Sequence, residues 1–322
     1  MQYRPLGRSG IEVSAIGFGA WGIGGRTPGA TSYGETDDAV SMRALEEAFE
    51  RGITFYDTAS VYGNGHSEEL IGACFSGRRE RVVIATKAGI LPSFKGYDFS
   101  ENAIRESLEG SLRRLQTDYI DVLQLHNVTP DTVLMQPHIG DLLSGFVREG
   151  KVRAYGFSTA SPGDAIALLD FPHTSCLQVN CNLLDWRGMD SGLFARAEAS
   201  EIGIIARTPL AFGFLTGRFG ETVTFPVDDH RSRWPRERIS AWVEGGAAIF
   251  AELGLPDGEE ARVSAAIRFC LSLKAVTTVI PGMMTAGEVQ ANVAAAAAGP
   301  FDGGQLSRIE RIYRAHQTRL GG

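Results

Sequence analysis

The sequence is short of cysteine, of positive charge and of long hydrophobic runs, and each shortage argues against a class of protein. Its four cysteines show no CxxC spacing and no paired framework, so we expect reduced structural thiols and no disulfide scaffold. The formal net charge is −7, which argues against nucleic acids and anionic membranes as partners. No segment approaches a membrane-spanning helix, and no hydrophobic leader opens the chain. We therefore expect a cytoplasmic protein.

Metal-binding patterns are also missing. The six histidines form no HExxH motif and no cluster with cysteine, so we expect no metal site. One nucleotide-binding pattern, GxGxxG, is matched by the sequence: residues 17–22 are Gly-Phe-Gly-Ala-Trp-Gly. A dinucleotide fingerprint of this kind must open a helix, and the next residues are glycine- and proline-rich. We therefore reject it as a Rossmann motif.

What the sequence does contain is an ordinary globular composition with a regular alternation. Of its 322 residues 43% are hydrophobic and 21% charged, enough for a sizeable core, and we expect a single domain of residues 1–322. Eight strand-like segments, each followed by a helix-like one, predict a (β/α)₈ TIM barrel. The expected strands are 15–18, 54–57, 82–86, 120–125, 154–157, 176–179, 203–206 and 277–280. The expected helices are 36–51, 67–76, 100–115, 139–149, 162–169, 192–200, 259–272 and 286–298.

Three further elements are expected outside this alternation. Segments 3–6 and 12–14 flank Gly-Arg-Ser-Gly and predict an N-terminal β-hairpin that covers one end of the barrel. A long segment, 217–252, separates the last two strands and holds an extra helix at about 237–253. A terminal helix at 305–318 completes the extra C-terminal helices. Long loops on such scaffolds are more often functional than decorative.

Ionisable residues stand where three of the expected strands end. Asp57, Lys87 and His126 close apolar runs, and Tyr62 lies five residues beyond the first of them. Taken alone, each of these four residues would be interpreted as a cap, a solvated charge or a packing residue, without a catalytic role. Because the C-terminal strand ends of such a barrel form its active site, we expect the four side chains to converge. A tyrosine beside a lysine–carboxylate pair can deliver a proton, and a histidine can hold a carbonyl oxygen.

The ordered motifs around these residues resemble those of the aldo-keto reductases, over about residues 3–298. The motifs are 56–63 (Tyr-Asp-Thr-Ala-Ser-Val-Tyr-Gly), 85–87 (Ala-Thr-Lys), 124–126 (Gln-Leu-His), 150–158 (Gly-Lys-Val-Arg-Ala-Tyr-Gly-Phe-Ser) and 280–282 (Ile-Pro-Gly) followed by Asn292. The resemblance implies reversible reduction of an aldehyde, ketone or sugar carbonyl. Tyr62 would be the general acid, Lys87 and Asp57 would tune it, and His126 would orient the carbonyl. No side chain can donate hydride, so a nicotinamide cofactor must supply it.

The resemblance also implies where the cofactor binds. The implied residues are Trp21, Asp57, Ser158, Gln178, Arg207, Pro209, Leu210, Gly213, Leu215, Gly217, Pro281, Gly282, Met284, Glu288 and Asn292. Two of the positions depart from the family. Thr159 stands where an asparagine is usual, and Arg207 stands where many members stack a tyrosine on the nicotinamide.

The choice between NADP(H) and NAD(H) stays open. The family prior favours NADP(H), whose 2′-phosphate is often held by a lysine or arginine after the Ile-Pro-Gly motif. Here Met283, Met284 and Glu288 stand in that region, and a carboxylate would repel the phosphate. An alternative interpretation is that they are surface residues of a helix cap. Arg207 or Arg218 could also supply the missing positive charge. NAD(H) is therefore about equally expected.

The substrate pocket is expected to be walled by Trp21, Phe94, Trp186, Arg231 and Trp234. The aromatic members could equally pack loops together. If Arg231 and Arg233 face the site, an anionic substrate is expected. Two other functions stay open, a nicotinamide-nucleotide-sensing regulatory subunit on the same scaffold and a Schiff-base enzyme using Lys87. The sequence carries no signal of oligomeric state.

Overall fold

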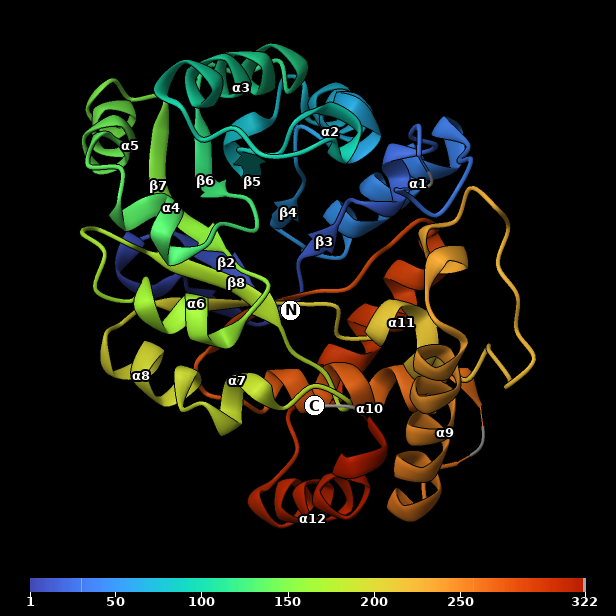
Figure 1. Cartoon of the computed structure of the whole chain (residues 1–322). Helices are drawn as coiled ribbons and strands as arrows, with labels where there is room; N and C mark the ends of the chain where they lie inside the picture. Colours follow the sequence, from blue (N-terminus) through green and yellow to red (C-terminus); the bar gives the residue numbers. More distant parts are fainter. Residues whose placement is uncertain (30, 257, 321–322) are drawn as a thin grey trace.

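The computed structural model describes residues 1–29, 31–256 and 258–320, and at its centre is a parallel sheet closed into a barrel (Figure 1). The predicted domain, 1–322, also includes residues 30, 257, 321 and 322, which lie outside the described residues. Eight strands pair in the order of the sequence, from β3 to β10. Parallel bridges from Ile16 to Val279 and from Gly19 to Gly282 close the sheet on itself. The strands are β3 (Phe18–Gly19), β4 (Phe55–Asp57), β5 (Val83–Ala88), β6 (Ile120–Leu125), β7 (Val152–Ser158), β8 (Cys176–Asn180), β9 (Gly203–Arg207) and β10 (Val276–Ile280).

Helices cover the outside of the barrel, as the alternation predicted (Figure 1). They are α1 (Asp38–Glu50), α2 (His66–Phe75), α3 (Glu101–Arg114), α4 (Pro130–Leu134), α5 (His138–Arg148), α6 (Pro162–Ala167), α7 (Arg187–Asp190), α8 (Leu193–Ala199), α9 (Arg236–Leu253), α10 (Glu259–Leu271), α11 (Ala286–Ala297) and α12 (Gly303–Leu320). Side-chain caps start several of them: Asp37 accepts from the Val40 N–H, and Thr285 accepts from the Glu288 N–H. The short helices α4 and α7 were not predicted, because neither is long enough to show a helical period.

The predicted hairpin closes the N-terminal end of the barrel. Strands β1 (Tyr3–Pro5) and β2 (Glu12–Ser14) pair antiparallel around a 3₁₀ turn at Gly7–Ser9. Leu6, Ile11 and Val13 are buried and share one apolar cluster with strand residues that fill the lower barrel. This plug keeps water out of one end of the barrel, so a ligand must enter from the other.

Alternation along the strands explains why polar groups gather at the open end. Successive strand residues face opposite sides, so residues two apart share a face. The lower interior positions are apolar, among them Phe55, Ala85 and Ile205. The next residue on the same face is Asp57, Lys87 or Arg207 respectively, and the pattern repeats on β6 and β8. Tyr56 faces outward, where its ring stacks on Phe18 and packs at a tilt against Phe75.

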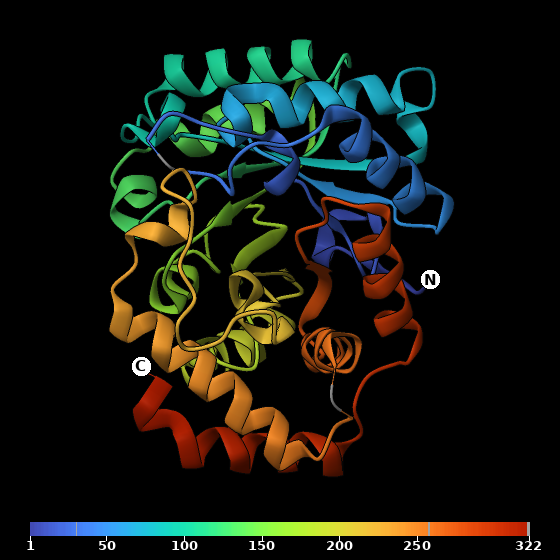
Figure 2. The same ribbon diagram turned by 90° about the vertical axis from the view of Figure 1, so that its right-hand side faces the viewer.

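The segment between β9 and α10 holds two 3₁₀ turns, Ala211–Thr216 and His230–Arg233, and then the predicted extra helix α9. Figure 2 shows α9 and α12 lying side by side at one end of the molecule, away from the hairpin. The predicted barrel with its hairpin and extra C-terminal helices is therefore confirmed. Residues 17–22 lead into a 3₁₀ turn at Gly22–Gly24, not an α-helix, in agreement with the rejection of the Rossmann motif.

Three properties of the described residues bear on the expectations from composition. All four cysteines are free and buried. Within the described ranges, no helix has the length and apolar character needed to cross a bilayer. The same part of the chain holds no group of three or more His, Cys, Asp or Glu side chains placed to bind a metal ion.

Candidate active site

The structure brings the four predicted catalytic residues together at the open end of the barrel, and they form the tetrad Asp57, Tyr62, Lys87 and His126. The buried Lys87 Nζ donates to Asp57 Oδ1 at 2.5 Å, to the Thr58 carbonyl at 2.8 Å and to Tyr62 Oη at 3.2 Å. Burial lowers the pKa of the lysine, but Asp57 and Tyr62 outweigh burial and leave that pKa above its ordinary value. Lys87 is therefore a fixed ammonium next to the phenol oxygen. A charged amine with three partners is a poor Schiff-base nucleophile.

Both oxygens of Asp57 accept hydrogen bonds. Besides Lys87, its Oδ2 accepts from Gln178 Nε2 at 2.7 Å and from Gln124 Nε2 at 3.1 Å. Both glutamines are buried, Gln124 on β6 and Gln178 on β8, and Gln124 Oε1 has no hydrogen-bond partner among the described residues. The Gln178 amide nitrogen, expected to face a cofactor, is thus directed at Asp57. Its oxygen remains available to accept a hydrogen bond.

His126 completes the group as a neutral imidazole. Its ring lies 6.0 Å from the Tyr62 ring, centroid to centroid, at 81°. Burial, followed by the nearby Lys87 and Arg207 charges, holds the pKa of His126 well below its ordinary value. A neutral imidazole carries one N–H donor, which suits it to hold a carbonyl oxygen without taking its proton.

These residues form one end of a cavity of about 620 Å³. Asp57, Tyr62 and His126 line that end, whereas Lys87 lies beneath them. The cavity continues past the β9 strand end to the start of α11. Of the predicted cofactor and pocket residues, those that line it are Trp21, Asp57, Phe94, Gln178, Arg207, Pro209, Leu210, Gly213, Arg231, Gly282, Met284, Glu288 and Asn292.

Other predicted residues lie behind this surface. Ser158 is buried and its Oγ accepts from Arg207. Leu215 is a core residue, and the Pro281 carbonyl accepts from the Gly19 N–H. Gly217 has φ +80° and lies against Arg262, between cavity residues Thr216 and Arg218. These four shape the cavity from its second layer.

Two of the predicted pocket residues, Trp186 and Trp234, do not line this cavity. Trp186 is buried against Phe269 and Tyr313 and donates to the Leu183 carbonyl, so it anchors α12 to the barrel. Trp234 packs behind Phe212, against other aromatic side chains of the β9–α10 segment. An aromatic residue in a loop can serve either purpose, and its neighbours in sequence do not reveal which.

Arg231 lines the cavity but does not act as a free cation there. Its Nε and Nη2 bind both oxygens of the buried Asp229, at 3.0 and 2.6 Å. Its Nη1 donates to the Phe212 carbonyl at 2.9 Å. The expectation that Arg231 selects an anionic substrate is therefore not supported, since Asp229 neutralises it. Its role here is to tie the two 3₁₀ turns together.

Arg207 faces the cavity with neutral partners. Its nitrogens donate to Asn180 Oδ1 at 2.7 Å, Ser158 Oγ at 2.9 Å, Asn127 Oδ1 at 3.1 Å and the Thr159 carbonyl at 2.8 Å. None of these four acceptors carries a charge. Burial lowers the pKa of the guanidinium, which nevertheless stays protonated because arginine starts so high.

A strained turn forms the middle of the cavity wall. Thr208, Ala211 and Phe212 have φ of +55°, +47° and +56°, in a region that side chains other than glycine rarely adopt. Gly213 follows with φ +93°. The N–H groups of Ala211 and Gly213 bond to the Thr208 and Leu210 carbonyls, each at 2.9 Å. Gly213 has no side chain, so a ligand can approach the backbone of this turn closely. Strain of this kind costs about 1–3 kcal/mol per residue and is typical of ligand-binding segments.

The far end of the cavity carries opposite charge. Arg218 Nη2 lies 2.6 Å from Glu259 Oε1, and its Nη1 lies 3.5 Å from Glu288 Oε1. Glu288 Oε2 also accepts from the Met284 N–H at 2.8 Å. Glu288 is thus both a helix-cap residue and a cavity residue, and Met283 is buried away from the cavity. Among the residues that line this end, two carboxylates share one arginine, and a further cation, Arg262, lies behind them against Gly217.

Sequence reasoning missed several lining residues. They are Tyr33, Asn127, Asn180, Thr208, Phe212, Thr216, Phe219, Glu259, Val263, Ile280 and Ala291, with Gly19, Ala20 and Gly22. Asn180 could have been found, because it stands two residues after Gln178 on the same strand face. The same rule places Gln124 before His126. Tyr33 and Phe219 have no such signal, because they come from irregular loops.

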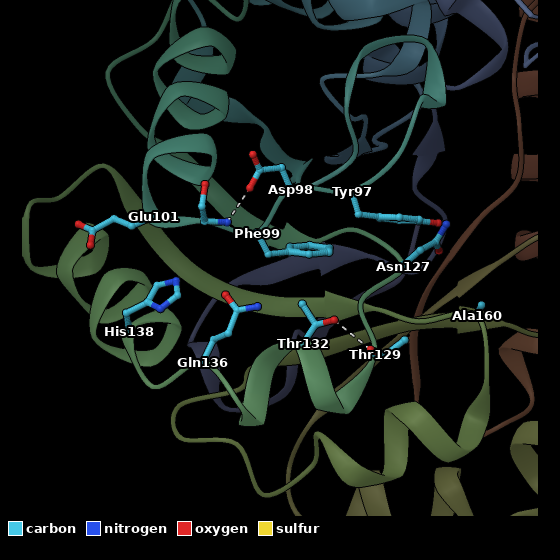
Figure 3. A pocket seen from close by; sticks show the side chains of 11 residues that line it. Tyr97, Asp98, Phe99, Glu101, Asn127, Thr129, Thr132, Gln136, His138 and Ala160 are labelled. Atoms are coloured by element: carbon cyan, nitrogen blue, oxygen red, sulfur yellow. Dashed lines mark hydrogen bonds between the residues drawn. The ribbon is translucent and has the colours of Figure 1, made fainter.

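A second hollow of about 1030 Å³ lies on the other side of Asn127, between the start of α3 and the α4–α5 region (Figure 3). The Tyr97 and Phe99 rings stack 6.0 Å apart on one wall. Thr129 and Thr132 bond to each other across the opposite wall. The tetrad does not line this hollow, so the hollow has no part in the proton chemistry.

Comparisons with known proteins agree with this geometry. A model of the aldo/keto reductase family matches residues 15–314. The chain is 34% identical over 242 residues to the Aldo-keto reductase YhdN of Bacillus subtilis (strain 168), which covers 73% of this chain and 70% of that protein. It is 32% identical over 232 residues to the NADH-specific methylglyoxal reductase of Escherichia coli (strain K12), covering 67% and 70%.

Among solved structures, the chain is similar to the aldo-keto reductase AKR11C1 from Bacillus halodurans. The holo form gives a TM-score of 0.79 at 27% identity, over 97% of this chain and 96% of that chain. The apo form gives 0.74 at the same identity and coverage.

Proposed function

The chain belongs to the aldo/keto reductase family, and we propose that it reduces small aldehydes, ketones or sugar carbonyls reversibly to alcohols with a nicotinamide cofactor. The observation that carries the proposal is the Lys87 ammonium, held by Asp57 and placed 3.2 Å from the Tyr62 hydroxyl at the end of a cavity. This arrangement favours a tyrosine that gives up a proton.

The residues along the cavity fit such a cofactor. When bound, the cofactor supplies the hydride, which no side chain can provide. The Gln178 oxygen, directed away from Asp57, would accept from the carboxamide, and Gly213, which has no side chain, would let the pyrophosphate approach the backbone of the turn at 211–213 closely. Asn292 and Met284 would border the adenosine end.

The side chains would then divide the proton chemistry among them. A carbonyl oxygen placed between Tyr62 Oη and His126 accepts a hydrogen bond from the neutral imidazole. Tyr62 donates its proton to that oxygen as the carbonyl carbon is reduced, and Lys87 stabilises the phenolate that remains. Asp57 keeps Lys87 charged and directed at the phenol. In alcohol oxidation the same phenolate acts as the base.

We further propose that the protein accepts NADH about as well as NADPH. In the described part of the chain, the arginine that lines the far end of the cavity is Arg218, and it is already shared by Glu259 and Glu288. A 2′-phosphate would therefore meet more carboxylates than arginines among the residues that line this end. A charge-assisted phosphate contact contributes roughly 1.5–3 kcal/mol, which this site does not offer. The Escherichia coli relative is named NADH-specific, which supports the proposal.

The substrate is proposed to be a small uncharged carbonyl compound. The walls nearest Tyr62 are the rings of Trp21, Tyr33 and Phe94, and Phe212 packs against Trp21. These rings favour a compact apolar or hydroxylated molecule. Arg231 is paired with Asp229 and therefore gives no support for selection of an anionic substrate.

The test is a panel of aldehydes, ketones and aldoses assayed with NADH and NADPH in parallel. The proposal expects measurable reduction with both cofactors, differing by less than about a hundredfold in kcat/KM, the range that one charge-assisted contact spans. Cofactor binding without turnover of any carbonyl would instead favour the regulatory-subunit function. Failure to bind either cofactor would reject both.

A further inference from the structure

The charges around the tetrad do not balance. Lys87 is paired with Asp57 at 2.5 Å, and Arg187 is paired with Asp185, another carboxylate whose charge acts on Arg207, at 2.6 Å. His126 is neutral. Among the described residues, no carboxylate lies within ion-pair distance of Arg207. One positive charge is therefore left over at the tetrad end of the cavity.

The side chain of Arg207 is fixed in place by its acceptors. Its bonds to Asn180, Ser158, Asn127 and the Thr159 carbonyl use the Nε and both terminal nitrogens, so the guanidinium cannot swing toward solvent. It lies on the cavity wall together with Gln178 and His126. A fixed charge in a partly desolvated site acts on a ligand more strongly than one in water.

Any hydride donor that reacts in this cavity must lie close to that charge. The carbonyl oxygen has to reach both Tyr62 and His126, and the donor carbon has to come within about 3–3.5 Å of the carbonyl carbon. The walls around that point include Gln178, Asn180 and Arg207. In reduction the carbonyl carbon accepts a hydride and its oxygen accepts the Tyr62 proton. A nicotinamide ring that supplied this hydride would be neutral before the step and a monocation after it, and Tyr62 would be a phenolate until solvent reprotonates it.

We propose, on the basis of the proposed function, that Arg207 makes this cavity bind the reduced nicotinamide cofactor more tightly than the oxidised one. The unpaired guanidinium repels the cationic ring of the oxidised form and leaves the neutral reduced ring unaffected. Between turnovers the enzyme then keeps the reduced cofactor bound, and the oxidised cofactor leaves readily after each turnover. Arg207 is thus a specificity-determining residue that poises the enzyme for carbonyl reduction.

The experiment is an equilibrium titration of the purified protein with NADH and NAD⁺, and with the NADP pair, followed by the fluorescence of Trp21 and the other tryptophans. In the wild type we expect the reduced form to bind at least about tenfold more tightly, the size of one moderately screened charge–charge repulsion. Arg207→Met should lower this ratio at least about tenfold, whereas Arg207→Lys should keep it. Circular dichroism checks that each variant is folded.

Arg231→Met is the matched control. It also removes an arginine from the cavity wall, but one neutralised by Asp229, so both forms should weaken together and their ratio should not change. An unchanged ratio in folded Arg207→Met contradicts the inference. If that variant does not fold, a wild-type ratio near one, or one favouring NAD⁺, contradicts it. Absence of binding by every cofactor would reject the proposed function itself, which is a distinguishable result.

Discussion

Lys87 has its ammonium enclosed by the barrel, where it bonds to Asp57, to a backbone carbonyl and to Tyr62. Replacing it by methionine keeps the packing and removes the charge that favours the phenolate. We expect Lys87→Met to lower kcat by about 10²–10⁴, the range of general acid catalysis. Steady-state kinetics on the best carbonyl substrate measures this. Lys95→Met, at an exposed site in the next loop, is the control and should keep its rate.

At the scale of single residues, the sequence predicts the site residues that stand at strand ends. It does not predict the surroundings of residues whose contacts come from loops. Asp57, Lys87 and His126 could be predicted to converge because parallel strands end at one edge of the barrel. The environment of Arg207 could not be predicted, because its acceptors on Asn127, Ser158 and Asn180 come from three different strand ends and loops. The neutralisation of Arg231 by Asp229 could not be predicted either, since nothing in the sequence shows that Asp229 is buried.

The start of α11 lies at the far end of the cavity, where the proposed cofactor would place its adenosine. Met284 lines the cavity, and Glu288 bonds to its backbone N–H while it shares Arg218 with Glu259. We expect Met284→Arg to improve NADPH binding relative to NADH by about tenfold or more, since it adds the charge-assisted contact that is missing. Titration with both cofactors measures the change. Met283→Leu, at a buried neighbour, should leave the preference unaltered. No gain in Met284→Arg would mean that the 2′-phosphate is held elsewhere.

The segment between β9 and α9 carries His230, packed 4.7 Å from Trp21 and 5.0 Å from Tyr33, centroid to centroid. Its Nε2 is buried without a partner among the described residues, and burial lowers the pKa of His230 to about 4. Because an unfolded histidine has a pKa of about 6.5, unfolding at a pH of about 5 takes up a proton. The stability that neutral His230 contributes is therefore present above pH 6.5 and is lost as the pH falls toward 4.

The matching test is the free energy of unfolding against pH between about 6.5 and 4.5. His230→Phe should reduce the slope by up to about 1.4 kcal/mol per pH unit, the contribution of one proton. His126, whose pKa is also lowered, adds to the wild-type slope and stays in both proteins. His173→Asn, at an exposed position, should keep the wild-type slope. An equal slope in His230→Phe would contradict the burial of this ring.

Regular elements were predictable because each carries its period over several residues. The strand expected at 120–125 and the helix expected at 100–115 agree closely with β6 and α3. The 3₁₀ turn at Ala211–Thr216 was not predictable, because Ala211 and Phe212 adopt left-handed backbone that their residue types disfavour. Tertiary contacts, including the bond from Arg231 to the Phe212 carbonyl, hold that conformation.

At the scale of the whole molecule, one apolar cluster runs from the first barrel strand to α12. It includes Ile16 at one end of the chain and Tyr313 at the other. We propose that residues 1–322 form one domain, and we expect a single calorimetric unfolding transition. NADH at about 100 times its Kd should raise the free energy of unfolding by about 2.7 kcal/mol without splitting the transition. Two resolved transitions would contradict the single domain.

The fold as a whole could be predicted because the alternation of strand and helix admits few closed architectures. The hairpin plug follows from Gly7 and Gly10 between two short strands. The arrangement of the long β9–α10 segment over the open end could not be predicted. Its aromatic residues pack on one another, and only the folded structure separates Phe212, at the cavity, from Trp234 behind it.

The most direct test of the proposed mechanism is the rate of carbonyl reduction by Tyr62→Phe, measured together with its affinity for NADH. The substitution removes the proton that the mechanism assigns to catalysis and little else, so kcat should fall by at least about 10³ while the Kd for NADH changes less than about threefold. Tyr33→Phe, which removes the hydroxyl of another cavity tyrosine, is the matched control and should retain most of its rate. A near-wild-type kcat in Tyr62→Phe would contradict the assignment of the acid and with it the proposed mechanism.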